Sequence, residues 1–260
     1  MKKILVTSLI AIILTTNVIA DTDGTNSLSK TSNSVKDCFE SLNRTTFALN
    51  QGLDKVVFKP VAEAYRALPS PVRSGTSNAL NNLSSLITVP NNILQGEFKT
   101  AGINTGRFVV NTTVGILGIL DVAEKIGFPK YEKEDYGQTL GVMGVGEGCY
   151  LVIPVLGPST IRDAVGSFIN ILGGDPYYNA SAHGNNEFLT DQVYMTTKVI
   201  SGVDFRAKNL ESIDNLEKNS MDFYASVKSL YIQDRQQKIA NSNPTIEIMY
   251  EGDWEEIETQ

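Results

Sequence analysis

Histidine and cysteine are scarce in this sequence of 260 residues, which contains only His183, Cys38 and Cys149. Transition-metal centres draw mainly on these residue types, and a Ser-His-Asp triad would depend on the single histidine. No Gly-x-Ser-x-Gly elbow accompanies that histidine, and nothing beside Cys149 apart from backbone dipoles would lower its pKa. The glycine-rich run 144–148 lacks the lysine and hydroxyl residue that end a phosphate-binding loop. We therefore expect no metal, no cofactor and no enzymatic activity.

Charged residues are also few, at 20% of the chain, compared with about 25% in an average globular domain. The formal net charge of −7 disfavours nucleic acid, whose protein partners carry a basic surface. Hydrophobic residues at 42% argue against wholesale disorder, and the length suits one large domain or two small ones. Asparagine, serine, threonine and glycine supply much of the remaining polarity.

The missing charge is concentrated in four stretches, residues 74–96, 108–120, 148–161 and 164–174, which contain no Asp, Glu, Lys or Arg. None is a convincing transmembrane span: the 13 helical residues 108–120 reach about 20 Å, short of a hydrocarbon core of about 30 Å, and the polar positions of the longer stretch 74–96 are largely asparagine and serine. Their length suits helices that lie within one leaflet or at its boundary. The alternative is a soluble helical bundle with an asparagine-rich surface.

The N-terminus has the pattern of a secretory signal peptide. Lys2 and Lys3 precede an apolar run over residues 4–14, and Val18-Ile19-Ala20 offers small residues at a cleavage site. We predict a signal peptide at 1–20, a Ser/Thr/Asn-rich linker at 21–34, a helical domain at 35–240, and an acidic tail at 241–260. Export would place Cys38 and Cys149 in an oxidising compartment, but the sequence leaves open whether they are bonded.

Apolar residues in the domain recur mostly at helical spacing. We expect helices from residue 35, over 61–68 behind Pro60, and from Ser70, with Ser70 as N-cap and punctuation at Pro90 and Gly96. Residues 97–120 form one long helix or two. The glycine-dense segment 137–157 is predicted as loop, with a short extended piece near 150–155. A helix over 160–172 capped by Ser159 and a last long element over about 186–240 complete an all-α fold, with Arg162-Asp163 as a structural charge cluster.

An ordered series of short motifs carries a resemblance to a known family. The motifs are Asn43-Arg44-x-x-Phe47-x-x-Asn50, Lys59-Pro60-Val61-Ala62, Leu94-Gln95-Gly96, Arg107-Phe108-x-x-Asn111-Thr112-Thr113-x-Gly115, Asp121-Val122-Ala123, Asp135-Tyr136-Gly137-Gln138-Thr139-Leu140-Gly141, Gly144-Val145-Gly146, Leu151-Val152-x-Pro154, Leu156-Gly157-Pro158-Ser159 and Arg162-Asp163. In this order they resemble the MlaA (VacJ) family of outer-membrane lipid-asymmetry proteins. The chain departs from the family in three places: Cys38 follows no lipidation box, Cys149 replaces a usual proline, and Leu42 replaces a usual phenylalanine.

The resemblance implies a ring-like arrangement of amphipathic helices in the inner leaflet of the outer membrane, around a central amphipathic channel. It implies removal of phospholipid from the outer leaflet and its transfer to a soluble periplasmic lipid carrier, beside a trimeric porin and without a chemical reaction. A soluble periplasmic helical scaffold or binding protein without lipid transport is the alternative. The departure at Cys38 leaves open how the chain is anchored.

Candidates for the lipid path are polar or aromatic residues on the low-charge helices and in the motifs: Phe47, Asn50, Asn78, Asn81, Arg107 and Asn111. Arg107 could bind a phosphate through a bidentate, charge-assisted contact. Each candidate has a structural alternative: Phe47 as a core residue, Arg107 paired with Glu97 or Glu124, and the asparagines as helix caps.

Overall fold

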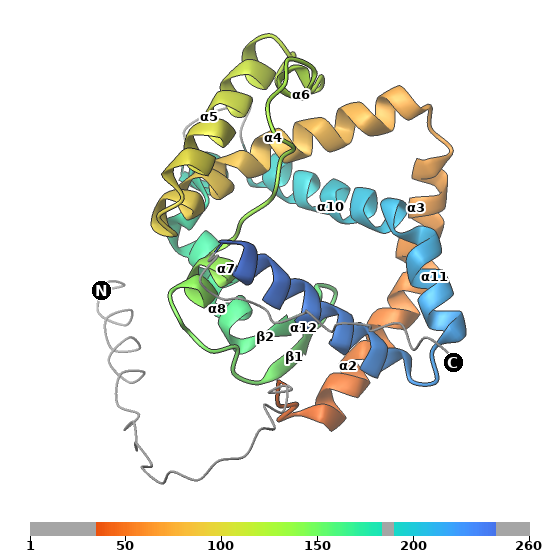
Figure 1. The fold of residues 1–260 in the computed structure, drawn as a ribbon. Coiled ribbons are helices and arrows are strands. Elements are labelled where there is room, and N and C mark those ends of the chain that lie inside the picture. Colours follow the sequence, from red (N-terminus) through yellow and green to blue (C-terminus); the bar gives the residue numbers. More distant parts are fainter. Residues whose placement is uncertain (1–34, 184–189, 243–260) are drawn as a thin grey trace, which may run out of the picture. The chain divides into compact units, whose positions relative to one another are not determined.

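The computed structural model describes residues 35–183 and 190–242, which are mostly helical (Figure 1). The predicted signal peptide and linker lie outside these residues, as does the acidic tail apart from residues 241 and 242, where the last helix ends. In chain order the elements are α2 (Glu40–Leu53), η1 (Asp54–Phe58), α3 (Lys59–Arg66), α4 (Ser70–Leu94), α5 (Phe98–Thr113), α6 (Val122–Lys125), α7 (Tyr136–Val142), β1 (Tyr150–Ile153), β2 (Gly157–Thr160), α8 (Ile161–Ile169), η2 (Asn170–Gly174), α9 (Pro176–His183), α10 (Asp191–Lys208), α11 (Leu210–Asn219) and α12 (Phe223–Ser242).

A small hairpin corrects the all-α prediction. The extended piece expected near 150–155 is β1, which pairs antiparallel with β2 in a register that places Tyr150 opposite Thr160 and Ile153 opposite Gly157. Four-residue strands give too short an alternation to stand out in the sequence. Tyr150 is fully buried and joins Val35, Val152 and Tyr224 in the apolar core cluster.

Several helix boundaries differ from the prediction. The expected long element at 186–240 is three helices, because Asn209 leaves the helical conformation and Ser220 is extended. α4 continues through Pro90 to Leu94, and its N-cap position is Pro69, with no side-chain cap. Thr160 caps α8 by accepting a hydrogen bond from the Asp163 amide, in place of the predicted Ser159.

Contacts between distant parts of the chain close a circuit. α3 packs against α10, α10 against α4, α4 against α5 and α7, and α7 against α8 and α12. The hairpin then contacts both α12 and α2, and α2 continues through η1 into α3. The approach of α8 to α7 requires glycine, since a Cβ on Gly166 would lie 2.3 Å from the Gly137 amide nitrogen. These contacts position the two cavities described below.

Candidate functional site

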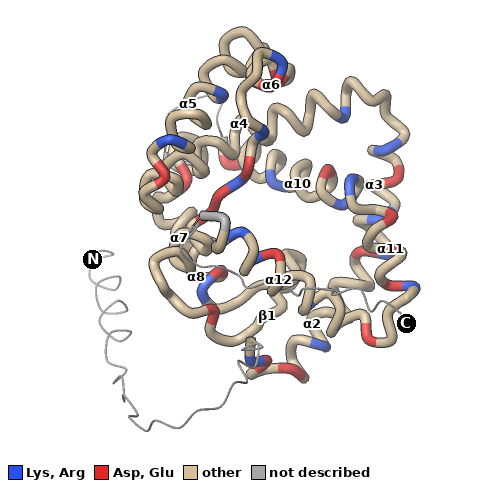
Figure 2. The backbone as a smooth tube through the Cα atoms, in the orientation of Figure 1, with Lys and Arg blue, Asp and Glu red and all other residues tan. Residues whose placement is uncertain are grey.

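The burial of polar and apolar side chains is partly inverted in this protein. α4 buries Ser77, Asn82, Ser85, Thr88, Asn91 and Asn92, and Ile87 is its only buried large apolar residue. The buried amides have partners: Asn92 accepts from Asn104 on α5 at 2.9 Å, and Asn91 accepts from Thr139 on α7 at 2.5 Å. Figure 2 shows the corresponding lack of charge along α4, whose only charged residue is Arg73. Much of the asparagine in this stretch therefore joins helices to one another.

Large apolar side chains lie on the surface instead. Four apolar residues on α8 and η2 follow helical spacing and are 42 to 65% exposed: Ile161, Val165, Phe168 and Leu172. The turn after α5 exposes Val114, Ile116, Leu117, Ile119 and Leu120. Apart from Arg162 and Asp163 on α8, both segments belong to the charge-free stretches of the sequence. Monomeric soluble proteins rarely expose contiguous apolar patches of this kind, which mark membrane or partner contact.

Within residues 35–183 and 190–242, no helix combines the length and the hydropathy that a membrane crossing requires. In the same ranges, no group of three or more His, Cys, Asp or Glu side chains could hold a metal ion.

An apolar cavity of about 660 Å³ lies among α2, η1, α10, α11, α12 and the hairpin. Its aromatic and aliphatic lining comes from several elements, including Phe47, Phe58, Phe205, Leu216, Phe223, Val227 and Leu230. Six charged residues also line the cavity, and each is paired with another: Arg206 with Asp54 at 2.8 Å, Lys55 with Glu217 at 2.7 Å, and Lys238 with Asp234 at 2.7 Å. The cavity is therefore mainly apolar and carries no net charge.

Phe47 and Asn50, two of the predicted lipid-path residues, both line this cavity. The Phe47 ring packs edge-on against Phe223 and Tyr224, with centroids 5.4 and 5.5 Å apart. Asn50 donates to the Ile153 carbonyl at 3.0 Å and accepts from the Val155 amide at 2.8 Å. Asn50 therefore lines the cavity and holds the hairpin at the same time.

Asn43 makes the same kind of contact two helical turns earlier. Its side chain donates to the Tyr150 carbonyl at 3.0 Å and accepts from the Val152 amide at 2.9 Å. Seven helical residues advance about 10 Å, as do three strand residues, so Asn43 and Asn50 on one face of α2 match the backbone of the hairpin. The Asn43-Arg44-x-x-Phe47-x-x-Asn50 motif thus fastens α2 along the β1 edge.

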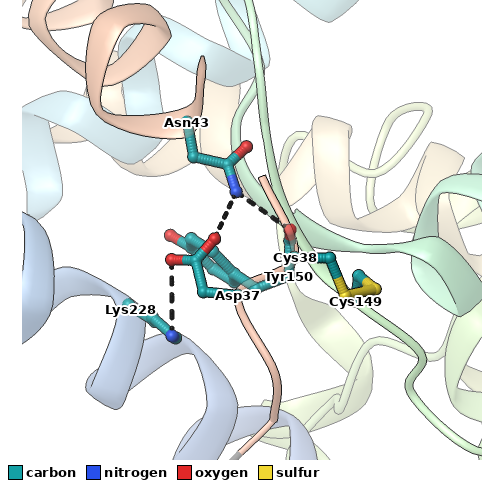
Figure 3. The surroundings of a disulfide bond; sticks show 6 residues. All are labelled: Asp37, Cys38, Asn43, Cys149, Tyr150 and Lys228. Atoms are coloured by element: carbon teal, nitrogen blue, oxygen red, sulfur yellow. Dashed lines mark hydrogen bonds and ion pairs between the residues drawn. A yellow bond between two sulfur atoms is a disulfide. The ribbon is translucent and has the colours of Figure 1, made fainter. Parts of the chain in front are cut away.

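A disulfide between Cys38 and Cys149 answers the question that the sequence left open (Figure 3). The two Cα atoms are 5.6 Å apart although 111 positions separate the residues. Beside the bond, Asp37 accepts from Asn43 at 2.7 Å and from the Tyr224 hydroxyl, and it pairs with Lys228 at 3.4 Å. Burial alone would raise the pKa of Asp37, but these partners lower it on balance. Since the Cys38 sulfur is in the disulfide, it cannot also carry a thioether-linked lipid.

A second, polar cavity of about 380 Å³ contains three more of the predicted residues, Asn78, Asn81 and Arg107. Arg107 is buried, pairs with Asp121 at 2.6 Å and donates to the Pro129 carbonyl at 2.7 Å. The structural alternative, an ion pair with Glu97 or Glu124, is therefore wrong in its partner. Asn111 does not line either cavity; it donates to Asp121 and accepts from the Ala123 amide. Burial would raise the pKa of Asp121, and its hydrogen bonds and Arg107 lower it on balance.

A buried ionic cluster, which sequence reasoning recognised only at Arg162-Asp163, holds α12 against α7 and α8. Arg235 donates to Asp135 at 2.7 Å and to Asp163 at 2.9 Å, and the Tyr231 hydroxyl donates to Asp163 at 2.6 Å. Burial would raise the pKa of both aspartates, but the hydrogen bonds and the charge of Arg235 lower them on balance. Arg235 lies within an ordinary amphipathic helix, so no local sequence signal identified it.

Five of the six predicted residues are therefore divided between two cavities, Asn111 lines neither, and the set does not form one cluster. Sequence reasoning missed most of the apolar cavity lining from α10, α11 and α12, including Phe205 and Phe223, and missed Arg73 and Lys130 in the polar cavity. The side chain of His183 lies outside the described part of the structure.

Comparisons with known proteins agree with this architecture. A family model described as MlaA lipoprotein matches residues 35–238, and the chain belongs to this family. The family is one of transport lipoproteins, not of enzymes, and membership implies a role in outer-membrane lipid asymmetry, with phospholipid and membrane association.

Individual relatives cover most of the chain. The intermembrane phospholipid transport system lipoprotein MlaA of Escherichia coli is 34% identical over 210 residues, or 79% of this chain and 78% of the relative. The protein of the same description from Haemophilus influenzae is 28% identical over 240 residues, covering 91% of this chain and 90% of the relative. A solved structure concerned with the maintenance of bacterial outer-membrane lipid asymmetry aligns with a TM-score of 0.66 at 33% identity, covering 78% of this chain and 99% of that one.

Proposed function

We propose that the protein removes phospholipid from the outer leaflet of the outer membrane and passes it to a soluble periplasmic lipid carrier, beside a trimeric porin. Its helices form a ring in the inner leaflet, and the lipid passes through an amphipathic channel. The Escherichia coli relative is described as part of an intermembrane phospholipid transport system, which supports the same class of cargo here. The circuit of helix contacts supports the ring.

The observation that carries this proposal is the apolar cavity of about 660 Å³, whose charged lining residues are paired with one another. Its volume lies within the usual range of small-molecule sites. A phospholipid has two acyl chains with about 30 methylenes, whose exposure to water costs about 25 kcal/mol at about 0.8 kcal/mol each. A transport protein must keep those chains in apolar surroundings, and the Phe47–Phe223 wall of the cavity supplies them.

The exposed apolar residues support placement in one leaflet. Ile161, Val165 and Phe168 form a stripe on α8, and Ile116 and Leu117 project from the turn after α5. Each of these side chains gains free energy by leaving water, about 25 cal/mol per Å² of apolar surface. Their spacing on one helix face and at one turn suits contacts at the level of a single leaflet, and we assign these residues to contacts within the inner leaflet.

Filling the apolar cavity tests the proposal. Val227 lines the cavity from α12 and is half-buried, so Val227→Trp places an indole in the lipid path. We expect native mass spectrometry of the detergent-purified protein to show bound phospholipid, and the variant to lose at least half of it. In cells, phospholipid accessible to externally added phospholipase should rise in the variant.

Met221→Trp is the matched control, because Met221 is fully exposed and does not line the cavity. It should bind lipid as the parent protein does. Lipid-free parent protein recovered wholly in the osmotic-shock fraction would contradict the proposal and favour the soluble periplasmic scaffold. Normal lipid binding and normal outer-leaflet composition in Val227→Trp would contradict the assignment of the path to this cavity.

A further inference from the structure

The polar cavity holds positive charge that the protein itself does not neutralise. Four cations and three acids line it, a net charge of +1. Two of the cations are committed, Arg107 to Asp121 at 2.6 Å and Lys208 to Asp204 at 2.8 Å. The remaining charged lining residues are Arg73, Lys130 and Glu124.

Arg73 and Lys130 have no carboxylate partner among the residues that the structure describes. Arg73 donates through Nε to the Leu68 carbonyl at 3.1 Å, which leaves its two Nη groups available. Lys130 forms no hydrogen bond or ion pair with a described residue, and its side chain is exposed. A guanidinium with both Nη groups open matches the oxygens of a phosphate or carboxylate, and a nearby ammonium adds charge.

The rest of the lining is suited to the same kind of ligand. The Tyr65 hydroxyl already donates to Asp204 at 3.1 Å and the Tyr131 hydroxyl is bonded to Thr88, so the donors that remain include the hydroxyl groups of Ser70 and Ser74 and the side-chain amide of Asn81. These groups donate hydrogen bonds to oxygen atoms without adding negative charge.

An exposed apolar segment adjoins this polar cavity. Asn78, on the cavity wall, donates to the Ile119 carbonyl at 3.1 Å, and this bond joins α4 to the turn after α5. In that turn Ile116 and Leu117 are 61 and 72% exposed. A polar, cationic cavity beside exposed aliphatic side chains matches a molecule with an anionic head and apolar chains.

We propose that this cavity is a second lipid site, in which Arg73 and Lys130 bind the phosphate of a phospholipid while the acyl chains lie along the turn after α5. The inference rests on the proposed function, since it names a contact of the same cargo at a place separate from the apolar cavity. Arg107, which the sequence had suggested for a phosphate, has a structural role here and fixes Asp121.

Calorimetric titration of the detergent-purified protein tests the site with two probes, dihexanoylphosphatidylglycerol and inorganic phosphate. We expect Arg73→Gln/Lys130→Gln to weaken binding of the lipid at least about 10-fold, because a charge-assisted pair is lost. Lys99→Gln, an exposed lysine on α5 outside the cavity, should leave the dissociation constant unchanged. Equal affinity of the parent protein and the double variant for the lipid would overturn the proposal.

Leu117→Asn distinguishes a site for a phospholipid headgroup from a site for free inorganic phosphate. Leu117 has a φ of 55°, a conformation that asparagine tolerates better than leucine, so the variant should fold. We expect it to weaken binding of the short-chain lipid and to leave binding of inorganic phosphate unchanged. Inorganic phosphate binding as tightly as the lipid in the parent protein would overturn the role of the acyl chains.

Val227→Trp separates this inference from the proposed function. Because Val227 lines the apolar cavity and not the polar one, its variant should lose transport and keep the part of the short-chain lipid titration that Arg73→Gln/Lys130→Gln weakens. Transport that proves absent from the parent protein would refute the proposed function and leave the calorimetric result standing.

Discussion

The Cys38–Cys149 disulfide should contribute mainly by restricting the unfolded chain. It closes a loop across 111 positions, for which the chain-entropy relation gives about 5 kcal/mol at 25 °C, at the upper end of what disulfides contribute. The folded state keeps other contacts at this place when the bond is absent: the Tyr150 amide donates to the Lys36 carbonyl at 2.9 Å, and Asn43 still holds β1. We therefore expect Cys38→Ser/Cys149→Ser to fold.

Urea unfolding in detergent micelles measures the effect. The oxidised protein should unfold with a free energy about 2 to 5 kcal/mol above that of the double serine variant. Dithiothreitol should lower the unfolding midpoint of the parent protein to near that of the variant and leave the variant unchanged. Amide exchange in β1 of the variant should remain slow relative to exposed turns, because the backbone partners of the strand persist.

Two outcomes would refute this reasoning. Two titratable thiols in the oxidised, denatured protein would show that the bond does not form. An unchanged unfolding midpoint combined with rapid exchange throughout β1 would show that the bond maintains local structure in the folded state and does not act through the entropy of the unfolded chain.

Two further predictions concern buried polar groups. Burial, together with repulsion from Glu97 and Asp135, raises the pKa of Glu134 from 4.5 to about 7. The folded protein therefore holds this proton more tightly than the unfolded chain, and the stabilisation from the protonated carboxyl is lost as the pH rises from 4.5 to 7. Glu134→Gln should remove up to about 3 kcal/mol from the change in unfolding free energy over this pH range. An equal dependence of the unfolding free energy on pH in the parent protein and the variant would contradict the raised pKa of Glu134. Asn43→Ala strands buried Tyr150 and Val152 backbone groups and should cost about 2 to 5 kcal/mol in urea unfolding. Asn50→Ala should lower the free energy of unfolding by less, because the bond that Asn50 accepts from the Val155 amide is exposed. A larger loss of stability in Asn50→Ala than in Asn43→Ala would contradict this reasoning.

The motif around Asn43 and Asn50 shows how far sequence reasoning could reach. Its residue types and order supported the family, and the structure puts two of its lipid-path candidates, Phe47 and Asn50, in the lining of the apolar cavity. Their main structural duty was not visible, since it depends on the β1 backbone about 100 positions later. A side-chain amide has the same sequence signature whether it faces a channel, caps a helix or holds a strand.

Arg107 shows the same limit for a charged residue. Its position in a motif indicated importance, but three acids were available within the surrounding sequence, Glu97, Asp121 and Glu124. The folding of the turn after α5 brings the Asp121 carboxylate to 2.6 Å from the Arg107 guanidinium. Glu97 and Glu124 form no ion pair among the described residues. The cations that remain open, Arg73 and Lys130, come from segments with no shared motif, so only their common cavity relates them.

The sequence by itself determined the helical class, the family and the places where charge is missing, because each of these is a local property of residue type and spacing. The tertiary structure decided which of the charge-free residues are covered. It buries Asn91 and Asn92 between helices and leaves Phe168 and Leu117 outside. It also joined Cys38 to Cys149, divided most of the predicted polar residues between two cavities and left Asn111 outside both. Burial, pairing and cavity formation depend on contacts between elements far apart in the chain, and no local pattern encodes those contacts.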